Sequence, residues 1–295
     1  MANKPNKTSP TEPPVEGGGT APTRCVFVAI IGAPNAGKST LVNALVGAKV
    51  TIVTHKVQTT RNQVRGITIE GASQIVLVDT PGIFKPRKRL ERAMVDAAWG
   101  GARDADVVVF IVDSQKGLDE NAQQILDKLK DVPQPRVLVL NKVDRVPKEQ
   151  LLDLTTKINQ ALAFDQTFMI AALTGYGVDA VKAHLARVAP LGPWHYPEDE
   201  ISDAPMRSLA AEITREKLFL RLHEELPYQS TVETTAWQER KDGSVRIEQT
   251  IFVERDSQRQ IVLGQGGRTI KSISMESRKE LTEILERPAH LFLYV

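Results

Sequence analysis

Short runs of Val, Ile, Leu and Phe without polar interruption recur along the first two thirds of the chain. Runs with the length of strands lie at 25–31, 74–79, 106–113, 136–141 and 166–172. Patterns with helical spacing lie between or after them, at 38–46, 90–102, 119–131 and 178–189. A further strand at 66–70 is expected to form a hairpin with 74–79. Apolar strands that alternate with helices are typical of a mostly parallel sheet covered on both faces.

The pattern changes after residue 189. Residues 190–206 contain four prolines and a cluster of acids, which indicates a linker, and we interpret its sequence PWHYPED as an aromatic staple between two domains. Beyond it we expect a helix at 208–226, strands at 228–240 and 244–255, helices around GQGG, and a last strand in HLFLYV. The predicted division is a disordered tail (1–23), an α/β domain (24–189), the linker (190–206) and an α+β domain (207–295).

Composition narrows the class of protein. The chain has 295 residues, of which 41% are hydrophobic, and no apolar run approaches the roughly 20 residues that span a bilayer. The net charge is only +2, so nucleic-acid binding would need a local basic patch. The single cysteine, Cys25, excludes an internal disulfide and fits a reducing compartment. Residues 1–23 show neither a signal-peptide nor a transit-peptide pattern, so we expect a cytoplasmic protein.

The sequence GAPNAGKST at 32–40 stands between an apolar strand and a helical pattern. Its spacing of Gly32, Gly37, Lys38 and Ser39 is that of a phosphate-binding loop, and in this context an ordinary glycine-rich turn is the weaker alternative. Small residues let backbone N–H groups point at phosphate oxygens, and the helix start adds positive potential. We expect Lys38 to reach the β- and γ-phosphates and Ser39 to bind Mg²⁺. The motif predicts a nucleoside triphosphate.

Two further motifs stand at the ends of predicted strands, and the second of them selects the base. In DTPG (79–82), Asp79 can hold Mg²⁺ through water, and the amide of Gly82 can reach the γ-phosphate. In NKVD (141–144), Asp144 can accept hydrogen bonds from N1–H and the amine of guanine. Adenine would leave that buried carboxylate unpaired, and such a site can discriminate by about 10⁴-fold or more. We therefore expect a guanine nucleotide.

The order GAPNAGKST, QTTR, DTPG, NKVD resembles that of a translation-factor-class GTPase. The sequence IVLGQGGRTIK, which follows TREKLFLRLHEELPY, resembles the KH domain of the Era family of bacterial GTPases. The resemblance covers the chain after the tail. It implies an α/β P-loop GTPase domain, with a mostly parallel sheet and helices on both faces, followed by an α+β type II KH domain.

The motifs and the resemblance together assign the site residues. Catalysis is expected from Lys38, Thr60 (with Thr59 as the alternative) and Gly82, and Mg²⁺ binding from Ser39, Thr60 and Asp79. Asn35 resembles the asparagine that holds K⁺ in potassium-stimulated relatives, and a structural role is the alternative. Contacts to GTP are expected from Gly32, Ala33, Pro34, Asn35, Ala36, Gly37, Lys38, Ser39, Thr40, Asp79, Thr80, Pro81, Gly82, Ile83, Asn141, Lys142, Asp144, Ala171 and Ala172.

Two positions of the nucleotide site depart from the usual pattern. Many small GTPases have a Gln after the DxxG motif to orient the attacking water, and this chain has Ile83, which cannot form that hydrogen bond. We therefore expect slow intrinsic hydrolysis. The family usually has Ser-Ala where this chain has Ala171-Ala172, so the rigidity of that loop is in question. The backbone N–H of Ala172 can still donate to the guanine oxygen.

The sequence GQGG at 264–267 is expected to clamp an RNA backbone, since glycines allow phosphates to come close. A tight turn with a solvated basic face is the alternative. The surrounding residues 259–279 contain Arg259, Arg268, Lys271, Arg278 and Lys279 against the single acid Glu276. We assign RNA binding to Gly264, Gln265, Gly266, Gly267, Arg268 and Lys271. A relative would usually have Lys in place of Gln265, so one phosphate contact is expected to be missing.

These expectations combine into a function. The resemblance implies a monomeric GTPase that binds GTP or GDP and the 3′ end of 16S rRNA, and that assists processing and assembly of the small (30S) ribosomal subunit. The alternatives are a tRNA-modification GTPase, for which no extra catalytic motif is visible, and an RNA-binding adaptor with little hydrolysis. Peripheral attachment to the inner membrane is implied by the resemblance alone. The basic run KPRKRLER at 85–92 fits either a phosphate contact or a solvated second switch.

Overall fold

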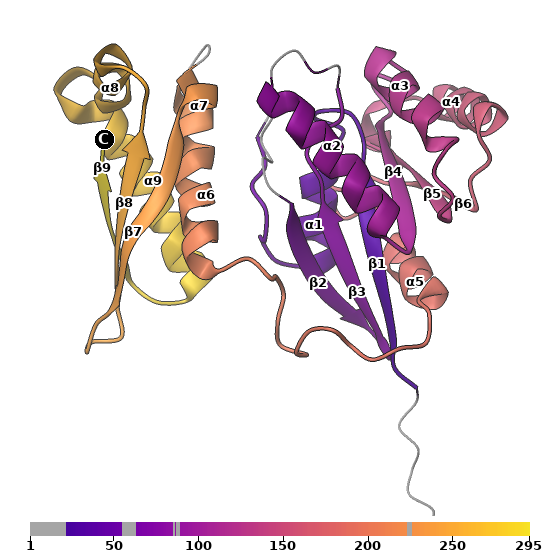
Figure 1. The fold of residues 1–295 in the computed structure, drawn as a ribbon, viewed down its shortest axis with the longest axis horizontal. Helices are drawn as coiled ribbons and strands as arrows, with labels where there is room; N and C mark the ends of the chain where they lie inside the picture. Colours follow the sequence, from indigo (N-terminus) through magenta and orange to yellow (C-terminus); the bar gives the residue numbers. More distant parts are fainter. Residues whose placement is uncertain (1–21, 55–62, 85, 87–88, 223–225) are drawn as a thin grey trace, which may run out of the picture.

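A computed structural model describes residues 22–54, 63–84, 86, 89–222 and 226–295 (Figure 1). The strands of the first domain are β1 (Arg24–Ile31), β2 (Val64–Glu70), β3 (Ser73–Asp79), β4 (Val107–Asp113), β5 (Arg136–Asn141) and β6 (Gln166–Met169). Within the described residues they form one six-stranded sheet in the order β2-β3-β1-β4-β5-β6. Strand β2 is antiparallel to β3, and the other neighbouring strands are parallel. The predicted mostly parallel sheet and the hairpin are confirmed.

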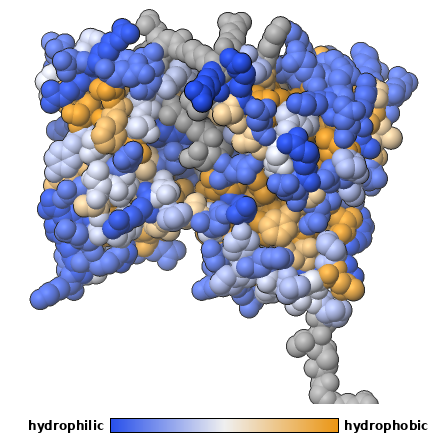
Figure 2. All heavy atoms as spheres, in the orientation of Figure 1, coloured by the Kyte–Doolittle hydropathy of each residue, from blue (hydrophilic) through white to orange (hydrophobic). Residues whose placement is uncertain are grey.

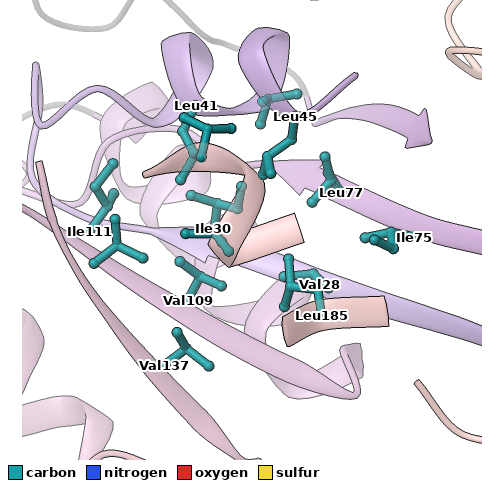
Figure 3. Close-up of a cluster of buried hydrophobic side chains, with 14 of the residues drawn as sticks. Val28, Ile30, Leu41, Leu45, Ile75, Leu77, Val109, Ile111, Val137 and Leu185 are labelled. Atoms are coloured by element: carbon teal, nitrogen blue, oxygen red, sulfur yellow. The ribbon is translucent and has the colours of Figure 1, made fainter. Parts of the chain in front are cut away.

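Helices cover both faces of this sheet, as predicted. One face carries α1 (Lys38–Val46) and α5 (Val178–Val188), and the other carries α2 (Arg89–Asp104), α3 (Glu120–Leu129) and α4 (Lys148–Ala161). Alternate residues of β1 pack on opposite faces of the sheet, because successive side chains of a strand point in opposite directions. Val28 and Ile30 pack with Leu41 and Leu45 of α1 (Figure 3), whereas Ala29 packs toward α2 and α3.

Helix α4 is absent from the sequence-based prediction. Its buried side chains are Leu151, Leu154 and Ile158, and polar residues occupy most of the other positions. Three apolar residues make a stripe too narrow to predict a helix from sequence. Packing against the sheet stabilises this helix. The other predicted helices of this domain match the observed ones to within a few residues.

The second domain has the predicted α-β-β-α-α-β order. Its elements are α6 (Met206–Arg221), the short α7 (Leu226–Gln229), β7 (Thr231–Glu239), β8 (Val245–Phe252), α8 (Asp256–Leu263), the 3₁₀ turn η2 (Gln265–Gly267), α9 (Arg268–Leu285) and β9 (Ala289–Tyr294). The strands lie in the order β7-β8-β9, antiparallel and then parallel. The first helix ends earlier than predicted, and the prediction of strand from residue 228 was wrong because Leu226–Gln229 is helical.

The aromatic part of the linker makes its contacts with the first domain. The indole N–H of Trp194 donates to the carbonyl of Ala72 at 3.1 Å, and the N–H groups of His195 and Tyr196 donate to the side chain of the buried Gln74. The interpretation of PWHYPED as a staple between domains was therefore wrong, because these contacts stay within one domain. The domain boundaries themselves stay predictions.

Charged side chains join the two domains beside the loop that follows α1. The ammonium of Lys49 lies 2.7 Å from Glu216 and also pairs with Glu280. Glu216 accepts a hydrogen bond from the N–H of Val53 at 2.8 Å, and Lys217 pairs with both glutamates. We call Lys49, Glu216, Lys217 and Glu280 the interdomain ion cluster. Helix α6 faces the first domain in Figure 1, and Figure 2 shows two lobes that meet above and part below.

Candidate functional site: a nucleotide site and a glycine turn

The phosphate-binding loop leads from β1 into α1. Gly37 precedes the helix with φ of +103°, and a Cβ there would lie 2.2 Å from the side chain of Asn141, so only glycine fits. The ammonium of Lys38 is buried and donates to the carbonyls of Gly32 and Ala33 at 3.2 and 3.0 Å. Burial lowers the pKa of Lys38 to about 8, and the charge of Asp79 acts in the opposite direction. The loop thus surrounds a cation suited to an anionic ligand.

Oxygen donors gather next to this lysine. The hydroxyl of Ser39 donates to the carboxylate of Asp79 at 2.8 Å, and the hydroxyl of Thr51 donates to the same oxygen at 2.9 Å. Two hydroxyls and a buried carboxylate are the kind of ligands that Mg²⁺ takes, so the predicted pair Ser39 and Asp79 fits the ion. Thr51 was not predicted, because nothing in its local sequence marks it. Thr60 and Thr59 lie outside the described residues.

The DTPG segment packs against the phosphate-binding loop. The hydroxyl of Thr80 donates to the carbonyl of Ile30 at 2.7 Å, and the N–H of Ile83 donates to the carbonyl of Gly32 at 3.1 Å. A Cβ on Gly82 would lie 3.0 Å from the Cα of Pro34, so the two loops approach closely. The side chain of Ile83 is buried among apolar residues and offers no group to orient water. Of the basic run at 85–92, residues 85, 87 and 88 lie outside the described residues.

The NKVD segment is hydrogen-bonded to the phosphate-binding loop and to the loop that contains Ala172. The side chain of Asn141 donates to the carbonyl of Ala36 at 2.9 Å and accepts the N–H of Ala172 at 3.0 Å. Lys142 donates to the carbonyl of Asn35 at 2.9 Å. The side chain of Asp144 is 47% exposed. The buried carboxylate expected from the sequence is therefore open to solvent here, where a guanine base would cover it.

The loop at Ala171 is held by hydrogen bonds although this chain has alanine where the family usually has serine. The N–H of Ala171 donates to the carbonyl of Tyr176 at 3.0 Å. The backbone N–H and the hydroxyl of Thr174 both donate to the carbonyl of Ala171, at 3.0 and 3.1 Å. Gly177 follows with φ of +74°, and a Cβ there would lie 2.6 Å from the carbonyl of Met169. These bonds hold the N–H of Ala172 in place beside Asn141 without the missing hydroxyl.

The GQGG sequence forms the turn between α8 and α9. Gly264 must be glycine, because its φ is +71° and a Cβ would lie 2.2 Å from the hydroxyl of Thr269. Gly266 and Gly267 also have positive φ, but the space where their Cβ atoms would lie is open. Gln265 and Gly266 are exposed, as are Arg268 and Lys271 on the first turns of α9. The turn therefore presents backbone and positive charge to solvent, as a phosphate clamp requires.

A P-loop nucleotide site on a parallel sheet, followed by an α-β-β-α-α-β domain with an exposed glycine turn, defines a GTPase joined to a KH domain. Family models agree: residues 27–142 match a model described as a 50S ribosome-binding GTPase, and residues 225–294 match a KH domain. We refer to these parts as the G domain and the KH domain.

Individual relatives define the family. The GTPase Era of Rhizobium meliloti is 66% identical over 94% of this chain and 88% of its own length, and that of Bradyrhizobium sp. strain BTAi1 is 67% identical over 93% and 89%. A crystal structure of Era in complex with MgGDPNP and nucleotides 1506–1542 of 16S ribosomal RNA is 35% identical, with a TM-score of 0.87 over 92% of this chain and 93% of the other. An Aquifex aeolicus Era variant bound to GDP and AlF₄⁻ gives the same values. The chain belongs to the GTPase Era family.

Within the described residues, no helix is both long and apolar enough to cross a membrane.

Proposed function

We propose that this GTPase hydrolyses GTP slowly in the cytoplasm, holds the 3′ end of 16S rRNA with its KH domain, and assists processing and assembly of the small ribosomal subunit. The observation that carries the proposal is the presence on one chain of a phosphate-binding loop, with Ser39, Asp79 and Asn141 bonded around it, and an exposed, basic glycine turn. The similar Era structure that holds both MgGDPNP and 16S rRNA supports it.

The roles in hydrolysis follow from the site. Lys38 neutralises the developing charge on the phosphates, and the N–H of Gly82 donates to the γ-phosphate. Ser39, Asp79 (through water) and Thr60 would hold Mg²⁺, which would supply further charge neutralisation when bound. Because Ile83 cannot orient water, turnover is expected on the order of 10⁻⁴ to 10⁻² s⁻¹, as for unassisted GTPases.

A potassium ion near Asn35 is part of the proposal. Asn35 has φ of +63°, and its carbonyl is fixed by Lys142. A backbone held in this way can present the side chain of Asn35 toward the phosphates, where K⁺ would replace an arginine finger. Turnover should be faster in KCl than in NaCl of equal ionic strength. Equal rates would remove the potassium site and leave the GTPase assignment intact.

The proposed RNA binding is tested by measuring the affinity for a 16S rRNA 3′-terminal oligonucleotide, with the native chain and with the double variant Gln265→Asp/Gly266→Asp. Two negative charges at the clamp should abolish RNA binding and leave RNA-free hydrolysis unchanged. The matched control is Gln238→Asp/Gly243→Asp, which changes the same residue types at the exposed β7–β8 hairpin, where Gly243 also has positive φ and open space. Lys38→Ala should abolish hydrolysis.

The salt dependence of RNA binding gives a second readout. With about three to four phosphates engaged, the logarithm of the association constant should fall against the logarithm of the salt concentration with a slope of about −2 to −3. Normal RNA binding by the Gln265→Asp/Gly266→Asp variant would contradict the assignment of the clamp.

A further inference from the structure

The carboxylate of Asp113 lies beside the nucleotide site and belongs to none of the motifs discussed above. Asp113 ends β4, and its Cα pairs with that of Asn141 at the end of β5. Its side chain is 7% exposed, and one oxygen lies 2.5 Å from the ammonium of Lys142. The other oxygen accepts the N–H of Gln115 at 3.0 Å. With both oxygens bonded, the carboxylate is fixed at the edge of the sheet.

Lys142 connects this carboxylate to the phosphate-binding loop. The same ammonium donates to the carbonyl of Asn35 at 2.9 Å. The next carbonyl along the loop, that of Ala36, accepts from the side chain of Asn141 at 2.9 Å. Two consecutive carbonyls are therefore held from the ends of β4 and β5. Asn141 holds the second directly, and Asp113 holds the first through Lys142.

The conformation that these bonds hold is an unfavourable one. Lys142 has φ of +64°, which such a residue adopts at a cost, and Asn35 has φ of +63°, which asparagine tolerates better. The amides of the loop must keep this arrangement to point at phosphate oxygens. Because a preformed loop binds its ligand without an ordering cost, contacts that preserve the conformation also raise nucleotide affinity.

We propose that Asp113 is a positioning residue for the nucleotide, which holds Lys142 and, through it, the Asn35 part of the phosphate-binding loop in the binding conformation. Asp113 touches neither base nor phosphate in this role. Base selection stays with Asp144, and the contact to the γ-phosphate stays with Lys38. The inference rests on GTP binding by this family and adds a residue that sets how long the nucleotide stays bound.

The test uses the full chain with Asp113→Asn, which keeps the size of the side chain and removes its charge. We expect release of a fluorescent GDP analogue, followed by stopped flow, to become about tenfold faster, since a charge-assisted hydrogen bond is lost. The KM for GTP should rise by a similar factor, with kcat within about twofold of the native value. The matched control is Asp127→Asn: Asp127 pairs with Lys130 at 2.8 Å on the exposed surface of α3, and release should be unchanged.

A double-mutant cycle shows whether Asp113 acts through Lys142. In a Lys142→Met background, adding Asp113→Asn should change the release rate by less than about twofold, because the bond is already lost. A native release rate for Asp113→Asn, or an undiminished acceleration in the Lys142→Met background, overturns the proposal. Thermal melting without nucleotide checks that each variant is folded. If Asp113→Asn does not fold, Asp113→Ser replaces it in the same cycle, and a native release rate for that variant overturns the proposal too.

Discussion

Lys38 shows how a single buried charge prepares the site for its ligand. Its ammonium is surrounded by backbone carbonyls, and burial lowers its pKa to about 8 although the charge of Asp79 partly opposes this. A bound triphosphate adds negative charge, which favours the protonated form and raises the pKa again. Binding above pH 8 therefore takes up a proton, while below pH 8 Lys38 is protonated in both states.

The affinity for GTP should consequently fall as the pH rises. Between pH 7 and pH 9 we expect the Kd, measured by competition at fixed Mg²⁺, to increase about tenfold. The measurement stops at pH 9 because the guanine base itself loses a proton at higher pH. Lys38→Arg is the control, since a guanidinium stays charged throughout and any remaining affinity should not vary with pH. A constant Kd for the native chain would contradict the assignment.

We assign the choice of base to Asp144. Asp144→Asn replaces an acceptor by an amide, which can donate to the oxo group that xanthine has in place of the amine of guanine. We expect the preference to shift from GTP toward xanthosine triphosphate, measured by competition at equal Mg²⁺. The side chain is half exposed without ligand, so the substitution should leave the melting temperature unchanged. A variant that still prefers GTP would show that another group reads the base.

At the scale of the elements, the junction between β1 and α1 depends on one glycine. Gly37→Ala adds a Cβ at 2.2 Å from the side chain of Asn141, whereas Gly47→Ala, at the other end of α1, adds one to open space. Both glycines have positive φ, which costs each variant about 1–2 kcal/mol, and the clash with Asn141 adds to the loss for Gly37→Ala. Only Gly37→Ala should also weaken GDP binding, by tenfold or more in a titration. Equal affinities for the two variants would mean that the close approach at Gly37 is unimportant.

Much of the G domain could be predicted because its signals are local. Unbroken apolar strands and the motifs at their ends define the sheet edge where the nucleotide binds, and α1 lies where the sequence predicts it. The turn at GQGG is predicted for the same reason. Each of these features is encoded within about ten residues of sequence.

The contacts that the sequence does not reveal are long-range. Thr51 reaches Asp79, and Asp113 reaches Lys142, only because the sheet brings together segments about thirty residues apart. Their local sequences carry no motif. Likewise, the linker composition predicts a connection but not its bonds to Gln74, which depend on one buried amide. Tertiary packing decides these features, so pattern reasoning cannot find them.

At the scale of the whole molecule, the interdomain ion cluster joins the loop that follows α1 to the KH domain. Burial alone would raise the pKa of Glu280, but hydrogen bonds from Lys217 and Lys49 outweigh it and lower the pKa below the ordinary 4.5. A carboxylate with a lowered pKa stabilises the folded state above its ordinary pKa, and this stabilisation is lost as the pH falls through the folded value. The cluster therefore stabilises the folded state at neutral pH, and this stabilisation is lost in acid.

Glu280→Gln tests this contribution. At pH 7 it should lower the free energy of unfolding by about 2 kcal/mol, measured with urea, because two lysines lose a charged partner. The difference from the native chain should shrink as the pH falls from 4.5 through the lowered pKa of the folded state, where the folded carboxylate also becomes protonated. Glu283→Gln, one turn along α9 and exposed, should change it by less than about 0.5 kcal/mol. Similar losses for both would contradict the account of the cluster.

The most direct test of the combined function is co-sedimentation of the chain with purified 30S subunits, in the presence of GDP or of a non-hydrolysable GTP analogue. A GTPase that uses GTP as a timer for binding should sediment with the subunit in the analogue state and be released in the GDP state. The Gln265→Asp/Gly266→Asp variant should stay in the supernatant in both. Native chain that does not sediment with either nucleotide, or a variant that sediments normally, would contradict the account.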